Sequence, residues 1–252
     1  MRSNKVRQVW QDGGNAVGCF LMLDSFVGAE ALAHAGYDFL FVDMQHGAID
    51  TRSAIAMMTA ISTTDCTPIV RVPSNEIGII NRALDHGAYG IVCPLVNSRA
   101  EAEQFIDAVR YPPEGSRSWG PVRAATYGGE DYTIEANRTL LTIAMIETRE
   151  AYENREEILD TAGLDAILVG PNDLGFSFGN WPRSMPEDPA AVEAIREIAK
   201  AATARGVMPG IHCGDAAMAR EMFIWGYRFA SVGTDLGHMM VGAAQSLASL
   251  RD

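Results

Sequence analysis

The sequence predicts an α/β protein with the fold of a (β/α)8 TIM barrel, and two observations support that prediction. Eight short apolar segments rich in β-branched residues recur along the chain, and each is followed by a stretch with helical periodicity. The apolar segments are continuous rather than alternating, which is typical of parallel strands covered on both faces. The chain has 252 residues, a length at which this barrel commonly forms one unit, so we expect residues 1–252 to form a single domain.

The predicted strands and helices alternate along the whole chain. We expect strands at 17–22, 39–44, 67–72, 90–95, 142–147, 166–171, 208–213 and 229–234. We expect helices at 28–35, 51–63, 76–86, 98–109, 148–160, 188–205, 214–225 and 237–250. Five of these helices are followed by a glycine that suits the left-handed residue ending many helices: Gly36, Gly87, Gly163, Gly206 and Gly226. A doubly wound open sheet is the alternative fold, because a count of eight units can arise partly by chance.

Two segments lack a predicted element. The longer is 110–140, between the fourth helix and the fifth strand, and the other is 172–187, after the sixth strand. Irregular loops of this length in a compact domain usually have a function. Three arginines and a tryptophan of the first segment are predicted either at the rim of a pocket or in a subunit contact: Arg110, Arg117, Trp119 and Arg123.

The composition excludes several classes of protein. A formal net charge of −12 argues against a nucleic-acid-binding protein, which needs a basic surface. No segment reaches the ~18 apolar residues of a membrane span, and the polar N-terminal segment shows no signal peptide. The 4 cysteines have neither zinc-site spacing nor the pattern of a disulfide framework. We therefore expect reduced, buried thiols in a cytoplasmic protein.

Side chains at the carboxyl ends of barrel strands converge on one site. Two carboxylates at neighbouring strand ends, Glu147 and Asp173, follow apolar segments in which a charge is costly unless it is paired or coordinated. Together they predict a cation site, and oxygen ligands favour Mg²⁺ or Mn²⁺ over zinc. The alternatives are a helix-dipole contact for Glu147 and a cap or turn for Asp173. The other polar residues at predicted strand ends are Asp43, Gln45, His46, Arg71, His212 and Asp235.

Two of these residues are candidates for chemistry. An imidazole titrates near neutral pH, so His46 is the best acid–base candidate, with a solvated or structural histidine as the alternative. Arg71 cannot release its charge and needs an anion, which is either a bound oxyanion or a protein carboxylate. Gly170 in the GPNDL segment allows close approach of the backbone, so N–H groups there could contact a carboxylate.

The lysine content restricts the mechanism. Barrels that cleave a carbon–carbon bond beside a carbonyl use either a lysine Schiff base or a divalent metal. Lys5 and Lys200 are the only lysines, in the polar N-terminal segment and in an outward-facing helix. Neither reaches the strand ends, so the sequence excludes the Schiff-base route and favours a metal. Glycine motifs for nucleotides and the serine-hydrolase elbow do not occur where they would be meaningful.

Six segments then point to a known family: FLFVDMQHGAID, IVRVPSN, LDHGAYGIVCPLVNSRAEAE, RYPPEGSRSWGP, AMIETREA and VGPNDL. Together they resemble the metal-dependent, pyruvate-specific class II aldolases, from about residue 15 to about residue 245. This family includes 4-hydroxy-2-oxoheptanedioate aldolase, 2-dehydro-3-deoxyglucarate aldolase and the bacterial hydroxy-ketoacid aldolases. The resemblance implies reversible aldol cleavage of 4-hydroxy-2-oxo acids to pyruvate, or a related 2-keto acid, and an aldehyde.

The resemblance also implies roles for individual residues. Glu147 and Asp173 would hold Mg²⁺, Mn²⁺ or Co²⁺, His46 would accept the proton, and Arg71 would stabilise the enolate or alkoxide. Asp85 would support the basicity of His46. Because Asp85 ends a helix on the face opposite the strand ends, it would have to act from a neighbouring subunit or through a local departure from the simple barrel.

Substrate binding and assembly follow from the same resemblance. The keto acid would lie against Arg71 and the segment Gly170, Pro171, Asn172 and Asp173. The protein would form a homohexamer in which the last helix is exchanged between neighbouring subunits. Its other partners would be small molecules, the 2-keto acid and the aldehyde, with neither nucleic acid nor membrane.

One residue departs from part of the family. The heptanedioate enzyme has a glutamine two residues before the metal-binding glutamate, where this sequence has Met145. A thioether cannot donate a hydrogen bond, so keto-acid placement must depend more on Arg71 and the segment 170–173. The methionine favours the hydroxy-ketoacid aldolase subgroup. The alternatives are a CoA-ester lyase, an oxaloacetate decarboxylase or a non-catalytic barrel that binds a ligand.

Overall fold

The computed structural model describes residues 1–183 and 185–251 and closes eight parallel strands into a barrel. Each strand pairs with the next along the chain, and β8 pairs with β1, so the barrel prediction is confirmed and the open-sheet alternative is wrong. The strands are β1 (Ala16–Leu21), β2 (Phe39–Asp43), β3 (Thr67–Arg71), β4 (Gly90–Cys93), β5 (Leu141–Ile146), β6 (Ala166–Val169), β7 (Met208–Cys213) and β8 (Phe229–Thr234).

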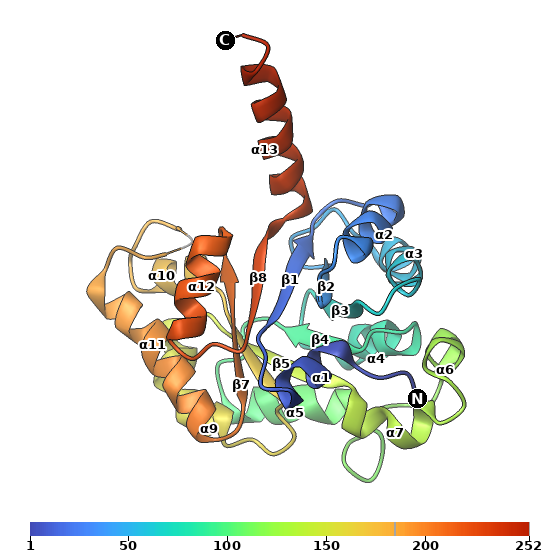
Figure 1. Cartoon of the computed structure of the whole chain (residues 1–252). Helices are drawn as coiled ribbons and strands as arrows, with labels where there is room; N and C mark the ends of the chain where they lie inside the picture. The colour runs from blue at the N-terminus through green and yellow to red at the C-terminus, as the bar shows by residue number, and fades with distance from the viewer. Residues whose placement is uncertain (184, 252) are drawn as a thin grey trace.

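Helices surround the barrel and connect its strands (Figure 1). The first group comprises α1 (Lys5–Gln11), α2 (Phe26–His34), α3 (Thr51–Ile61), α4 (Ile77–Asp85), α5 (Arg99–Val109), α6 (Val122–Gly128) and α7 (Tyr132–Thr139). The second comprises α8 (Arg149–Glu153), α9 (Arg155–Leu159), α10 (Pro171–Ser177), α11 (Pro189–Ala204), α12 (Ala216–Ile224) and α13 (Asp235–Ala248). All five glycines predicted to end helices adopt positive φ, from 72° at Gly206 to 104° at Gly36 and Gly87.

The continuous apolar strands supply two hydrophobic cores at once. In β2, Phe39 and Phe41 pack inside the barrel, whereas Leu40 and Val42 pack between the strand and the helices. Side chains of a strand alternate between its two faces, so both faces are apolar only when both are buried. Gly18 leaves room for the ring of Phe39, which a Cβ at that position would overlap.

Four segments are more helical, or less regular, than predicted. Residues 110–140 contain α6 and α7, and 172–187 begins inside α10. The polar N-terminal segment forms α1, whose Val6 and Trp10 are four residues apart and are buried on one face. The predicted helix 148–160 is divided into α8 and α9, because Asn154 between them is not helical (φ −91°, ψ 8°). The helices α1, α6 and α7 each bury a pair of residues four apart, and a single residue divides 148–160, features that average periodicity does not resolve.

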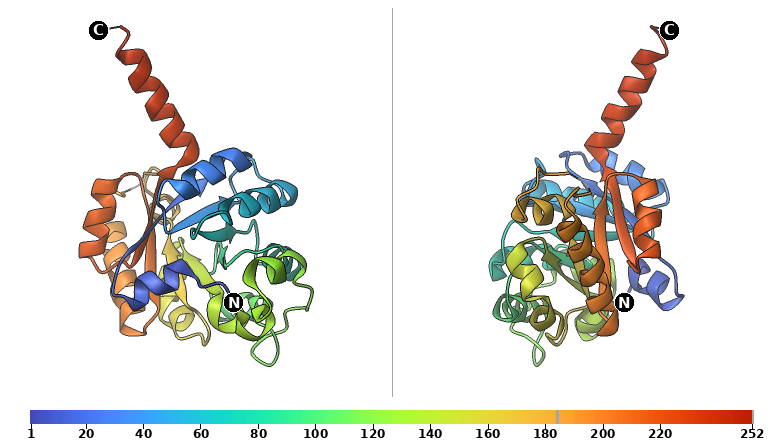
Figure 2. Two further views of the ribbon diagram at one scale, coloured as in Figure 1. Left: turned by 45° about the vertical axis from the view of Figure 1, so that its right-hand side comes forward. Right: turned by 90° about the vertical axis from the view of Figure 1, so that its left-hand side faces the viewer.

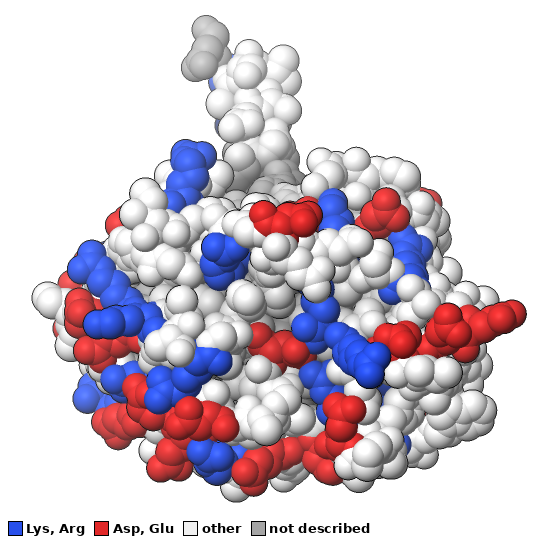
Figure 3. Space-filling model, turned by 60° about the horizontal axis from the view of Figure 1, so that its bottom comes forward, with Lys and Arg blue, Asp and Glu red and all other residues white. Residues whose placement is uncertain are grey.

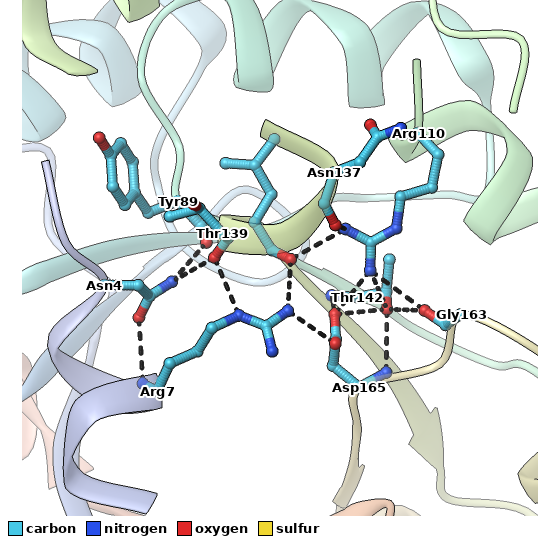
Figure 4. Close-up of polar contacts among 10 residues, drawn as sticks. Asn4, Arg7, Tyr89, Arg110, Asn137, Thr139, Thr142, Gly163 and Asp165 are labelled. Carbon is cyan, nitrogen blue, oxygen red and sulfur yellow. Dashed lines mark hydrogen bonds and ion pairs between the residues drawn. The ribbon is translucent and has the colours of Figure 1, made fainter. Parts of the chain in front are cut away.

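A network of hydrogen bonds closes the bottom of the barrel, around Asp165 just before β6 (Figure 4). The Asp165 carboxylate accepts hydrogen bonds from Arg7 of α1 at 2.6 Å and from Arg110 at 2.7 Å. It also accepts one from the backbone N–H of Thr142 at 2.9 Å. Arg110 further donates to the carbonyl oxygens of Asn137 and Leu140. Arg110 is therefore a buried structural residue, and both predictions for it, a pocket rim and a subunit contact, are wrong.

The outer surface differs between the bottom of the barrel and α13. On the bottom face, acidic and basic side chains are intermingled (Figure 3). In contrast, α13 projects from the barrel and lies against none of its sides (Figures 1 and 2). It has no buried residue among those described, and it exposes Leu236, Met239, Met240, Val241 and Leu247. Among residues 1–183 and 185–251, no helix is long and apolar enough to cross a bilayer.

We predict that Asp165→Ala destabilises the protein by about 3 to 5 kcal/mol, because it leaves the guanidinium of Arg110 buried without its carboxylate. The urea unfolding midpoint at fixed protein concentration measures the effect. Asp160→Ala is the matched control: its carboxylate pairs with Arg205 but is 51% exposed, so the cost should stay below about 1 kcal/mol. Equal shifts for the two variants would contradict a stabilising role of the network.

Candidate active site

A cavity of about 580 Å³, measured to its open mouth, lies at the carboxyl ends of the strands. Its lining residues come from β1, β2, β3, β5, β6, β7 and β8 or from the turns that follow these strands: Phe20, Met22, His46, Arg71, Met145, Gly170, Pro171, Asn172, Asp173, His212 and Thr234. The structure therefore brings His46, Arg71 and the segment 170–173 together, as predicted. Ligand pockets in α/β barrels occur at this end.

Arg71 is held by a buried carboxylate. Its Nε donates to Asp43 Oδ1 at 2.8 Å and its Nη2 donates to Asp43 Oδ2 at 2.6 Å, a two-point contact between neighbouring positions of β3 and β2. The guanidinium also lies over the ring of Phe20, 4.5 Å from its centroid. Among the described residues its Nη1 has one hydrogen-bond contact, with the sulfur of Met145 at 3.9 Å. Since a thioether is a weak acceptor, Nη1 is the part of Arg71 that can still bind an anion in the cavity.

Asp43 also shapes the turn that carries His46. Its Oδ1 accepts from the backbone N–H of Gln45 at 3.1 Å and of His46 at 3.4 Å. The turn is tight, because a Cβ on Gly47 would overlap the carbonyl oxygen of Asp43. His46 is exposed at the cavity mouth, and within the described residues no side chain hydrogen-bonds its imidazole. The sequence places Asp43 at a strand end, but we assigned it no role from the sequence. The pairing could have been expected, because Asp43 ends an apolar strand and the next strand ends in an arginine.

Glu147 is the most perturbed acid of the site. It is 2% exposed, and burial, together with the charge of Asp173, raises the pKa of its carboxyl to about 7. The backbone N–H of Leu95 donates to its Oε1 at 2.9 Å. Leu95 adopts φ 53° to do so, and no other non-glycine residue of the described chain has a positive φ. A left-handed leucine costs about 1 to 2 kcal/mol, so the fold accepts strain where it positions this carboxylate.

The second oxygen of Glu147 fits a divalent metal. It has no hydrogen-bond partner among the described residues and lies against Gly170, where a Cβ would stand 2.9 Å from it. Asp173 follows in the first turn of α10. No group of three His, Cys, Asp or Glu side chains that could hold a metal occurs within the described residues. Two carboxylates with room for oxygen ligands from water or substrate suit Mg²⁺ or Mn²⁺.

Part of the cavity lining is apolar, with a polar residue among it. Phe20, Met22 and Met145 supply the apolar surface. His212 lies among them, and its Nδ1 is 2.9 Å from Ser231 Oγ. Burial, and secondly the charge of Arg71, lowers the pKa of His212 to about 4, so this imidazole is neutral at physiological pH.

Asp85 lies outside this cavity. It ends α4, at the end of the barrel where strands begin, and its carboxylate accepts from Arg117 Nη2 at 2.8 Å. Arg117 is buried against the rings of Tyr111 and Tyr132. Within one chain, therefore, Asp85 does not lie beside His46. This agrees with the expectation for a simple barrel, in which the two residues are at opposite ends.

The two remaining arginines and the tryptophan of the segment 110–140 do not line the cavity either. Arg117 is buried beside Asp85, and Arg123 donates to the carbonyl oxygen of His86 and to Ser62. Trp119 is 71% exposed. The pocket-rim prediction is thus wrong for this chain's own cavity, whereas a subunit contact stays a prediction for Trp119.

A family model described as HpcH/HpaI aldolase/citrate lyase matches residues 16–241. The chain belongs to this family. It is 40% identical, over 98% of its length and 99% of the relative, to a hydroxypyruvate/pyruvate aldolase of Rhizorhabdus wittichii. It is 36% identical to a 5-keto-4-deoxy-D-glucarate aldolase of Escherichia coli, over 92% of this chain and 90% of the relative. An HpcH/HpaI family protein from Burkholderia cenocepacia superimposes with a TM-score of 0.92 at 34% identity, covering 99% of this chain and all of that one. Membership confirms the aldolase resemblance seen in the sequence.

We predict that His212 lowers the stability of this protein in acid. An unfolded histidine has a pKa near 6.5 and the folded one about 4, so unfolding takes up a proton between these values. Stability is fully present above about pH 6.5 and falls by up to about 3 kcal/mol as the pH drops to about 4.

Urea unfolding at a series of pH values measures this loss. His212→Gln should remove it, whereas the control His34→Gln, at an exposed helical position, should leave it unchanged. The same acid sensitivity in wild type and His212→Gln would show that His212 is not held neutral.

Proposed function

We propose that the protein is a metal-dependent aldolase that reversibly cleaves 4-hydroxy-2-oxo acids to pyruvate, or a related 2-keto acid, and an aldehyde. The observation that carries this proposal is the meeting of one fixed guanidinium, the carboxylate of Asp173 and one accessible imidazole at a single cavity, with the buried carboxylate of Glu147 beside its Gly170. Family membership and relatives named as keto-acid aldolases support the same reaction.

Glu147 and Asp173 would hold the divalent metal, with Mg²⁺, Mn²⁺ and Co²⁺ as the proposed ions. When bound, such an ion acts as a Lewis acid toward the keto and carboxylate oxygens of the substrate. The raised pKa of Glu147 supports this assignment, because a nearby cation stabilises the charged form of a buried carboxyl.

Arg71 would stabilise negative charge on the keto-acid oxygen. Its Nε and Nη2 are already bound to Asp43, so the guanidinium cannot swing away, and Nη1 faces the cavity. A donor held in place before the reaction needs no reorganisation when the C3–C4 bond breaks and an enolate forms. The segment Gly170–Asp173 would bind the substrate carboxylate through backbone N–H groups of Asn172 and Asp173.

His46 would act as the base in the cleavage direction. It takes the proton of the C4 hydroxyl, the C3–C4 electron pair moves to the keto acid, and the aldehyde leaves; protonation of the enolate at C3 then gives pyruvate. In the direction of synthesis the same imidazole returns the proton to the alkoxide. The exposed position of His46 at the cavity mouth suits contact with the incoming aldehyde.

The alternatives are less well supported. A CoA-ester lyase would require a basic surface for the nucleotide, whereas the chain carries a net charge of −12. Decarboxylation of oxaloacetate would pass through the same enolate and is compatible with the cavity as a side activity. A non-catalytic barrel would have no need for the polar groups left without partners in the cavity, such as Asn172 Oδ1, which is buried.

We further infer an oligomer, with a homohexamer as the proposed state. The helix α13 buries none of its described residues and presents five apolar side chains to solvent, so it suits exchange onto a neighbouring subunit. Assembly is also the way in which Asp85 of one subunit would support His46 of another. The cytoplasm is the proposed compartment, and the free, buried cysteines suit its reducing conditions.

We predict that chelation abolishes catalysis. After dialysis against EDTA, pyruvate release from a 4-hydroxy-2-oxo acid should fall at least about 100-fold, because the Lewis acid contributes several kcal/mol to the transition state. Added Mg²⁺, Mn²⁺ or Co²⁺ should restore it. Glu147→Gln should bind Mn²⁺ weakly in a direct titration and should not be rescued by these ions. Full activity of the chelated protein would rule out the metal role.

We predict that His46→Ala lowers kcat by about 10² to 10⁴-fold, the usual contribution of a general base, while the fold is unchanged. A coupled lactate dehydrogenase assay measures pyruvate release. His34→Ala removes an exposed histidine far from the cavity and should retain wild-type kcat. Unchanged turnover in His46→Ala would exclude this residue as the base.

A further inference from the structure

His212 is a polar residue of the cavity that the proposed reaction does not use. It lies on β7, directly paired with Ser231 on β8, and its ring stands edge to face with Phe20 at 5.4 Å between centroids. It lines the cavity together with the apolar side chains of Met22 and Met145. A neutral imidazole in this position can exchange a hydrogen bond with a ligand.

The contact with Ser231 decides which ring nitrogen carries the proton. Ser231 is 0% exposed, and within the described residues its hydroxyl has no hydrogen-bond partner other than His212 Nδ1, at 2.9 Å. A hydroxyl has a single hydrogen to donate, and burying it without an acceptor would cost about 1 to 3 kcal/mol. The hydroxyl therefore donates to Nδ1, and a neutral ring with an unprotonated Nδ1 carries its hydrogen on Nε2.

The Nε2–H group is free to act on a ligand. Among the described residues Nε2 has no partner, and it is not among the buried polar atoms that lack one, so it is open to the cavity that His212 lines. Two neighbouring side chains of the lining, Phe20 and Met22, present carbon and sulfur, and Thr234 Oγ1 already accepts from the backbone N–H of Gly237. Arg71 is a donor bound to Asp43.

We propose that His212 is a specificity-determining residue whose Nε2–H donates a hydrogen bond to a hydroxyl oxygen of the substrate, carried by the keto acid or the aldehyde within one carbon of the bond that forms. The proposal rests on the proposed aldol reaction and adds the substrate class to it: hydroxylated rather than plain keto acids or aldehydes. A substrate without that hydroxyl leaves a partly buried donor unsatisfied, and such sites discriminate strongly against the missing group.

Three reactions of the metal-loaded protein test this. Pyruvate with acetaldehyde is the reference, hydroxypyruvate with acetaldehyde adds a hydroxyl to the keto acid, and pyruvate with glycolaldehyde adds one to the aldehyde. The ratio of kcat/KM between each hydroxylated pair and the reference is measured for the wild type and for His212→Leu, His212→Gln and Ser231→Ala. A change confined to one ratio identifies which substrate carries the hydroxyl.

We expect His212→Leu to lower one ratio at least about tenfold while the reference reaction is kept. His212→Gln retains an N–H group near the position of Nε2 and should recover part of that ratio. Ser231→Ala frees the tautomer and should lower the same ratio by a smaller factor. Nitrogen NMR of labelled histidine should show the proton on Nε2 in the wild type and a mixture in Ser231→Ala.

Three results would overturn the proposal, and they have different consequences. An active wild type whose ratios are unchanged in His212→Leu excludes the role of His212 and leaves the aldolase function intact. A wild type that makes no product from any of the three pairs overturns the aldolase function and this proposal with it. A proton found on Nδ1 in the wild type would also exclude the donor assigned to the cavity.

Discussion

Arg71 carries a charge that it cannot release, and inside the barrel this charge is balanced by Asp43, which is itself buried. Two parallel hydrogen bonds leave the guanidinium one orientation, with Nη1 toward the cavity. The same carboxylate accepts from the backbone of the turn that carries His46, so one buried acid positions both the guanidinium of Arg71 and the turn of His46. Loss of either partner would leave an unpaired charge in the barrel. The groups around this pair must therefore keep both partners in place.

Polar groups at the two ends of the barrel differ in how fully they are hydrogen-bonded. At the bottom, Asp165, Arg7 and Arg110 satisfy one another and nearby carbonyl oxygens, so charge there closes the barrel and stabilises it. At the top, one oxygen of Glu147 and Nε2 of His212 have no hydrogen-bond partner among the described residues. Unsatisfied groups lower stability in the free protein and gain partners when a ligand binds. This asymmetry separates the end that maintains the fold from the end suited to chemistry.

Two features of the single chain suggest contacts with other subunits. The projecting α13 exposes apolar side chains that a free helix in water would not favour, and Asp85 remains with Arg117 at the far end of its own barrel. Both observations are explained if neighbouring subunits contribute to one another. The cavity, in contrast, combines Asp173, the guanidinium of Arg71 and the imidazole of His46 within one chain, and Glu147 lies beside its Gly170.

The order of the strands, the positions of five helix-ending glycines and the residues near strand ends follow from the sequence alone. Parallel strands buried on both faces must be continuously apolar, and a charged residue ending such a strand is conspicuous, as Glu147 is. Local pattern could not show α1 or α7, since each buries only a pair of side chains four residues apart. Nor could it assign the partners of Arg110 and Arg71, which lie 55 and 28 residues away at Asp165 and Asp43. The sequence by itself thus determined the barrel and its candidate metal ligands. Only the tertiary structure decided which arginine closes the bottom of the barrel and which lines the cavity, because a buried charge depends on the partner that the fold brings to it.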